Sequence, residues 1–167
     1  MFGARAAILH GSARLTADVD VTVGLPDAAA YPALITALES HGFELRTSAP
    51  TFVERTRVIP VVHSRTKLPL DLVLAGSGIE DRFFARARTH QIDDVSVPVA
   101  SAEDVVLMKV LAGRPKDLDD VVAVVAARAA DLDTRYIQRT LRELEEALTR
   151  DDLLPVFNDA VARSKER

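Results

Sequence analysis

Two aspartates alternate with valines in residues 18 to 23, which read DVDVTV. A β-strand sends residues i and i+2 to the same face, so Asp18 and Asp20 are predicted to point their carboxylates in the same direction. Like charges that share a site oppose each other's ionisation, and burial adds to that cost. A third acid, Asp71, lies inside a second strand-like run, LPLDLVL. These three acids, set in apolar runs, are therefore the first candidates for chemistry.

A bound divalent cation converts such a cluster from a cost into a gain. Mg²⁺ (or Mn²⁺) suits carboxylates because it is a hard ion that takes oxygen ligands and shares its remaining positions with water and substrate phosphates. In a two-metal site, one ion steadies the leaving phosphates while the other lowers the pKa of an attacking hydroxyl. The alternative interpretation is structural: Asp18 and Asp20 mark a solvated loop edge, and Asp71 lies on an exposed edge strand.

Composition limits the remaining classes of protein. The 167 residues are 48% hydrophobic, which is enough for one domain with a core. The absence of cysteine excludes disulfides and thiolate metal sites and favours a cytoplasmic protein. No apolar run reaches the roughly 20 residues that cross a bilayer, so we expect no membrane partner. The net charge of −4 gives no general attraction to nucleic acid, and we interpret the local cluster Arg82, Arg86 and Arg88 as a solvated helix face.

The elements that must position the acids alternate between helix and strand. Apolar spacing and the Gly and Pro positions predict helices over residues 4–9, 27–43, 79–92, 101–113, 121–132, 134–149 and 153–164, and strands over 18–25, 52–64, 68–76 and 95–100. This order predicts an α/β (α+β) fold with a small mixed β-sheet and flanking helices. We expect residues 1–100 to form the α/β core and residues 101–167 a helical region packed on it, in one compact unit.

The residues before the acid pair match a known pattern. The stretch MFGARAAILHGSARLTADVD resembles the signature of the nucleotidyltransferase superfamily of the polymerase-β type, in which a glycine followed by glycine or serine precedes two acids around an apolar residue. Gly3 and Ala4 stand at the first pair, residues 5–17 fill the gap, and Asp18 and Asp20 are the acids. More narrowly, HGSARLTADVDVTV, LPLDLVLAG and VPVASAEDVVLMKVLAGRPKDLDDV look like the AbiEii-like branch. Those bacterial proteins often act as the toxin of a toxin–antitoxin pair.

The resemblance implies a set of residue roles. Asp18, Asp20 and Asp71 would bind metal, and Asp71 would also help to deprotonate an acceptor hydroxyl. Gly3 and Ala4 would lie against the nucleotide phosphates. Further residues implied in phosphate contacts or in bracing the loop are Arg14, Thr16, Lys109 and Lys116. For the two lysines, a surface position at a helix end is the competing interpretation.

The implied reaction is magnesium-dependent transfer of a nucleoside monophosphate, or of a pyrophosphoryl group, from an NTP to a hydroxyl. The acceptor would be a tRNA, a protein or a small molecule, and a cognate antitoxin would be a partner. Asp117, Asp119 and Asp120 are expected instead to start and orient the helix that follows them.

The sequence departs from the family pattern at two points. Ala4 replaces the usual serine or second glycine, so only backbone N–H groups remain for phosphate, and we expect weaker nucleotide binding. The strand that leads into the glycine pair in the family has no counterpart here. Two explanations stay open: either this start is truncated, or the sheet is smaller and has an open edge that a partner chain could cover.

Other classes remain open at this point. Asp18, Asp20 and Thr22 also fit the Asp-x-Asp-x-Thr motif of haloacid-dehalogenase phosphatases, but there the acids follow a hydrophobic strand, whereas here the valines come after them. A glycosyltransferase with a DxD motif finds no further support. Because a fold does not imply an activity, a nucleotide-binding or partner-binding module is the non-enzymatic alternative.

Overall fold

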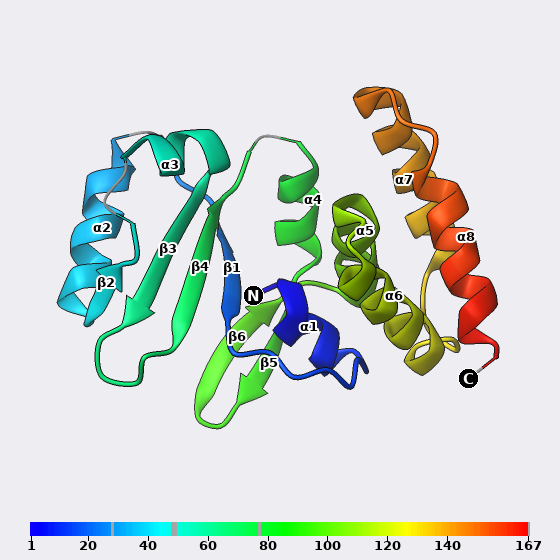
Figure 1. The fold of residues 1–167 in the computed structure, drawn as a ribbon, viewed down its shortest axis with the longest axis horizontal. Coiled ribbons are helices and arrows are strands. Elements are labelled where there is room, and N and C mark those ends of the chain that lie inside the picture. The colour runs from blue at the N-terminus through cyan, green and yellow to red at the C-terminus, as the bar shows by residue number, and fades with distance from the viewer. Residues whose placement is uncertain (28, 48–49, 77, 167) are drawn as a thin grey trace.

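The computed structural model describes residues 1–27, 29–47, 50–76 and 78–166. Its elements, in chain order, are α1 (Gly3–Leu9), β1 (Val19–Val23), α2 (Ala30–Ser40), β2 (Phe43–Leu45), α3 (Pro50–Thr56), β3 (Val58–His63), β4 (Pro69–Leu74), α4 (Ile79–Arg86), β5 (Arg88–Ile92), β6 (Val95–Val99), α5 (Ala102–Ala112), α6 (Pro115–Ala127), α7 (Thr134–Leu148) and α8 (Leu153–Ser164). The predicted α/β class, with a small mixed sheet and a C-terminal helical region, is confirmed (Figure 1).

The sheet has the order β1-β4-β3-β2, in which β1 runs parallel to β4 and the other pairs are antiparallel. Ile59, Val61 and Leu72 form its buried apolar face, against which residues of α2 and α3 pack. Because side chains alternate along a strand, the neighbours of Leu72 in β4 and of Val21 in β1 point to the opposite face. That face carries the acids.

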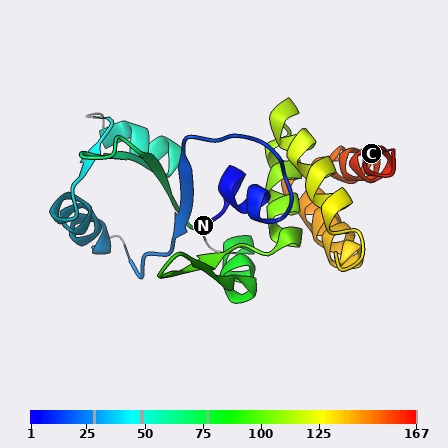
Figure 2. The ribbon, with the colours of Figure 1, turned by 90° about the horizontal axis from the view of Figure 1, so that it is seen from below.

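A second hydrophobic core lies among the helices. Ala6 and Ala7 of α1 are fully buried there, in one cluster with Leu107 of α5, Ile137 of α7 and Phe157 of α8. Figures 1 and 2 both show α1 between the sheet and the C-terminal helices. The boundary expected at residue 100 thus runs through one core, to which the N-terminal helix contributes.

The first two residues of the chain lie along the outer edge of β1. The N–H of Phe2 donates to the carbonyl of Asp20 at 3.0 Å in an antiparallel bridge, and the N–H of Ala100 donates to the carbonyl of Met1 at 3.0 Å. The edge that a smaller sheet would leave open is therefore partly occupied by the chain itself. Within the described residues, no helix is long and apolar enough to cross a membrane.

Two sequence-based expectations were wrong in element type. Within the strand expected over 52–64, the first residues belong to α3, and Arg57, at φ 56, turns the chain into β3. Within the helix expected over 79–92, α4 ends at Arg86 and β5 follows. There the pairing of β5 with β6 through the hairpin turn at Asp93 replaces the helix. Both differences arise from turns at non-glycine residues with positive φ, which sequence patterns signal weakly.

The interpretation of Arg82, Arg86 and Arg88 as one solvated helix face was also wrong. Arg86 pairs with Glu103 at 2.9 Å and with the buried Asp104 at 3.3 Å, and its guanidinium carbon lies 3.9 Å from the centre of the Tyr136 ring. Arg88 lies on β5. Arg86 thus joins α4 to α5 and α7.

The buried face of the sheet gives a direct stability test. Ile59→Ala deletes methyl groups from a fully buried position, and we expect the free energy of unfolding to fall by about 2–5 kcal/mol in urea denaturation. Ile92→Ala, at a position that is 39% exposed on β5, is the control and should cost less than about 1 kcal/mol. Equal losses in the two variants would contradict the assignment of the core.

Candidate active site

A cleft of about 210 Å³ lies between the sheet and helices α5 and α6. We call it the acidic cleft after the three acids on its sheet side, although basic side chains line the opposite side. The parallel register of β1 and β4 pairs Asp20 with Asp71, and Asp18 precedes β1 on the same wall. The other lining residues are Phe2, Gly3, Ala4, Arg14, Val105, Met108, Lys109, Ala112, Arg114, Lys116 and Asp117. All the site residues inferred from the sequence line this cleft except Thr16, whose hydroxyl donates to Asp18.

Asp20 is the most constrained of the three acids. Burial raises its pKa above the usual 3.8, and the neighbouring charges of Asp18 and Asp71 raise it further. A hydrogen bond from the backbone N–H of Ala4, at the start of α1, works in the opposite direction. The cleft therefore holds a carboxylate that is costly to ionise unless a positive charge approaches it.

Gly3 makes this approach of α1 to Asp20 possible. Its φ is +68°, and a Cβ built there would lie 1.9 Å from Oδ2 of Asp20. Any side chain would displace the carboxylate, so glycine is required for a steric as well as a conformational reason. In the structure, Gly3 thus lies against the carboxylate of Asp20, whereas the resemblance implied that it would lie against the nucleotide phosphates.

Asp18 and Asp71 each have a polar partner. The hydroxyl of Thr16 donates to Oδ1 of Asp18 and is the main reason why the pKa of Asp18 lies below its usual value. Arg46, at the end of β2, donates to Oδ1 of Asp71. Arg46 was not identified from the sequence, because only the pairing of β2 with β3, and of β3 with β4, brings it to this acid.

The wall opposite the sheet is held by a buried ionic network. Lys109 is 6% exposed, and its Nζ donates to Asp117 and to Asp120, at 2.7 Å each. The expectation that these two acids serve to start a helix was incomplete, because both are buried and neutralise Lys109. The interpretation of Lys109 as a surface lysine was wrong for the same reason.

This network extends into the loop before β1. Asp120 also accepts from the hydroxyl of Ser12 at 2.7 Å and from Arg14 at 3.0 Å. Burial would raise the pKa of Asp120, but the hydrogen bonds from Lys109 and Ser12 outweigh it and hold the pKa below its usual value. The loop that precedes the acids is thus tied to α6. Arg114, which also lines the cleft and was not singled out from the sequence, pairs with Asp117.

The three acids offer only oxygen donors, which are the ligands that Mg²⁺ and Mn²⁺ prefer. Within the described residues, no group of three acids or histidines is already arranged around a metal position. One oxygen of Asp18 faces Thr16, and one of Asp71 faces Arg46. The donor chemistry nevertheless fits a divalent cation, since burial and the neighbouring carboxylates raise the pKa of Asp20, and both are costs that such an ion relieves.

Comparison with known proteins adds no assignment at this point. No protein-family model matches the chain, and no curated protein matches it either.

The pKa of Asp20 predicts a stability gain on neutralisation. Because the folded-state pKa is raised, stability falls as pH rises from 3.8 through that pKa, and at neutral pH the ionised carboxylate destabilises the fold. Asp20→Asn in EDTA should therefore be more stable than wild type at pH 7, by an amount that disappears below pH 3.8.

Asp18→Asn is the matched variant with the opposite sign. The pKa of Asp18 is lowered, so its charge stabilises the fold above 3.8, and this contribution is lost as pH falls through the lowered pKa. Asp18→Asn should be less stable than wild type at pH 7. Urea titrations over a series of pH values measure both differences, and equal signs for the two variants would contradict the geometry.

The Lys109 network predicts a large structural penalty. Lys109→Met leaves Asp117 and Asp120 buried without their shared cation. We therefore expect the free energy of unfolding to fall by about 3–5 kcal/mol. Lys116→Met, at an exposed lysine in the same cleft, should change stability by less than about 0.5 kcal/mol. Urea denaturation of both variants at neutral pH is the measurement, and similar stabilities would show that Lys109 is not a structural cation.

Proposed function

We propose that the protein is a metal-dependent nucleotidyltransferase, which transfers a nucleoside monophosphate from an NTP to a hydroxyl acceptor. The observation that carries this proposal is the register that sets Asp20 directly opposite Asp71 in a cleft that Asp18 also lines. Asp18, Asp20 and Asp71 would hold Mg²⁺ or Mn²⁺. When bound, the metal supplies neutralisation of phosphate charge and a lower pKa for the attacking hydroxyl.

The residues of the chain divide the remaining work between them. In the transfer, the acceptor oxygen forms a bond to the α-phosphorus, the bond to the β-phosphate oxygen breaks, and pyrophosphate leaves. Asp71 is the carboxylate that would take the hydroxyl proton. Arg14, Arg114 and Lys116 line the same cleft and are the cations that would contact the phosphate oxygens. Arg14 and Arg114 would do so with the N–H groups that are not used in their pairs with Asp120 and Asp117.

Ala4 and Lys109 have narrower parts in this proposal. The N–H of Ala4 already serves Asp20, so α1 would orient the acid more than it contacts phosphate. Lys109 is committed to two carboxylates, so it would fix the wall on which the phosphate-binding cations stand. Thr16 would brace Asp18.

A nucleotide-binding or partner-binding module is the second candidate. The ion pair of Arg46 with Asp71 favours it, because that cation already compensates one of the three acids. The phosphatase alternative is less favoured, since a loop and not a strand precedes Asp18. A tRNA, protein or small-molecule acceptor, a toxin role with a cognate antitoxin, and a cytoplasmic location are parts of the proposal that rest on the resemblance of sequence.

The test is transfer of label from each α-labelled NTP, with Mg²⁺ or Mn²⁺, to an extract of total tRNA and protein. We expect label on one acceptor class, and a loss of about 100-fold or more in Asp20→Asn and Asp71→Asn, because both remove charge that the reaction requires. Asp94→Asn, at an exposed acid in the turn between β5 and β6, is the matched control and should retain full transfer. Circular dichroism would verify that each variant is folded.

Two outcomes would contradict the proposal. Undiminished transfer by Asp20→Asn would place the chemistry elsewhere. Absence of label, together with absence of metal-dependent NTP binding in calorimetry, would favour the partner-binding module.

A further inference from the structure

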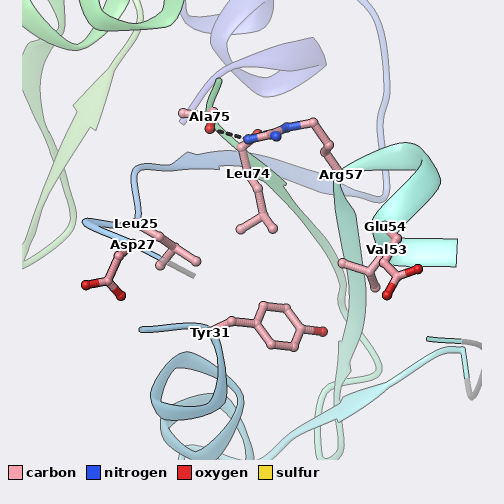
Figure 3. A pocket seen from close by; sticks show the side chains of 8 residues that line it. All are labelled: Leu25, Asp27, Tyr31, Val53, Glu54, Arg57, Leu74 and Ala75. Carbon is pink, nitrogen blue, oxygen red and sulfur yellow. Dashed lines mark hydrogen bonds between the residues drawn. The ribbon is translucent and has the colours of Figure 1, made fainter. Parts of the chain in front are cut away.

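A second cavity, of about 630 Å³, lies at the other end of the same two parallel strands. β1 and β4 both run from the acidic cleft toward it, and Leu74 and Ala75 form one wall at the carboxyl end of β4 (Figure 3). The other lining residues are Leu25, Asp27, Tyr31, Val53, Glu54 and Arg57, all different from those that line the cleft. Its volume is in the range of small-molecule sites, and the carboxyl ends of parallel strands are a common place for them.

The wall of this cavity is held in place by Arg57. Its backbone has φ 56, an uncommon conformation for a residue other than glycine. The carbonyl of Arg57 accepts from the N–H of Leu74 at 2.8 Å, and its N–H donates to the carbonyl of Val53 at 2.7 Å. Its guanidinium donates to the carbonyls of Leu74 and Ala75. Arg57 therefore joins α3 to the end of β4 and uses two of its side-chain N–H groups on backbone carbonyls.

The charged side chains of the lining are two acids and one base, Asp27, Glu54 and Arg57, so the lining carries a net negative charge. Glu54 is exposed at the rim, and within the described part of the chain no hydrogen-bond or ion-pair partner is found for its carboxylate. Asp27 accepts from the N–H of Ala30 at 3.0 Å, and in Figure 3 its carboxylate points away from Tyr31. The same view shows the Tyr31 ring across the cavity from Leu74, with its hydroxyl end toward the side of Val53 and Glu54.

From this arrangement we infer a binding site for an organic cation with an aromatic or apolar body. The body would lie between Tyr31 and Leu74, and the amine would meet the carboxylate of Glu54 at the rim. An anionic ligand would face an unpaired carboxylate there. This site is independent of the proposed transfer reaction, because it shares no lining residue with the cleft.

Three indole probes of nearly the same shape test the inference on the full chain. They are tryptamine, which is a cation, tryptophol, which is neutral, and indole-3-acetate, which is an anion. Methyl NMR of Leu25, Val53 and Leu74 reports on the cavity, while Val105 and Met108 report on the cleft. We expect tryptamine to shift the cavity methyls and to bind about five-fold more tightly than tryptophol, with indole-3-acetate weakest.

Two variants test whether the carboxylate of Glu54 causes the preference for the cationic probe, and a third tests the Tyr31 ring. Glu54→Gln should abolish the preference for tryptamine over tryptophol, while Glu39→Gln, at an exposed acid on α2, should keep it. Tyr31→Leu should weaken all three probes.

Three results would overturn the inference. The first is that no probe shifts the cavity methyls at millimolar concentration, and the second is that tryptamine shifts only the cleft. The third is that its preference survives Glu54→Gln.

Discussion

The like-charge pair formed by Asp20 and Asp71 is the constraint on which the rest of the site depends. Parallel pairing of β1 with β4 places the two residues in register on the same face. Directly opposed like charges destabilise a sheet, so the surrounding elements must compensate them. Arg46 forms an ion pair with Asp71, and a backbone N–H at the N-terminus of α1 donates a hydrogen bond to Asp20. The closeness of α1 in turn requires Gly3.

The wall of the cleft opposite the sheet, formed by α5 and α6, is held together by a buried lysine and its acidic partners. A buried lysine is stable only when its charge is paired and its donors are used. Asp117 and Asp120 meet that condition for Lys109, and Asp120 extends the network to Ser12 and Arg14. The same contacts therefore fix helix α6 against α5 and hold the loop that leads into Asp18. Lys109, Asp117 and Asp120, which the sequence alone would allow at the surface, therefore hold the wall of the cleft in place.

Local pattern was enough to predict the acids and the elements that carry them. The alternation of valine and aspartate places acids in a strand whose other face is apolar, and the helix expected over 101–113 corresponds to α5, which Ser101 caps by accepting from the N–H of Asp104. The partners of those acids were not predictable in the same way. Arg46 reaches Asp71 only through two strand pairings, so no spacing in the sequence reveals the contact.

The wrong elements have a related cause. Residues 88–92 follow a helical pattern in the sequence and were expected to continue that helix. Their pairing with β6 makes them a strand instead. The turn at Arg57 is similar, because a positive φ at arginine is maintained by its contacts with Val53, Leu74 and Ala75, which come from α3 and the end of β4. Hairpin pairing in the first case and contacts between neighbouring elements in the second, which sequence periodicity does not encode, decided the structure.

The two ends of the parallel pair β1 and β4 are mechanically linked. One-residue slippage between them would break the register that pairs Asp20 with Asp71 at one end and Val23 with Leu74 at the other. Slippage would also turn apolar side chains out of the core beneath α2 and α3, so the sheet resists it. The carboxyl-end cavity and the acidic cleft are therefore held at a fixed separation by the register of one strand pair. On the acidic face, α1 adds to this restraint, because its first residues contact Asp20 and its alanines are anchored in the helical core.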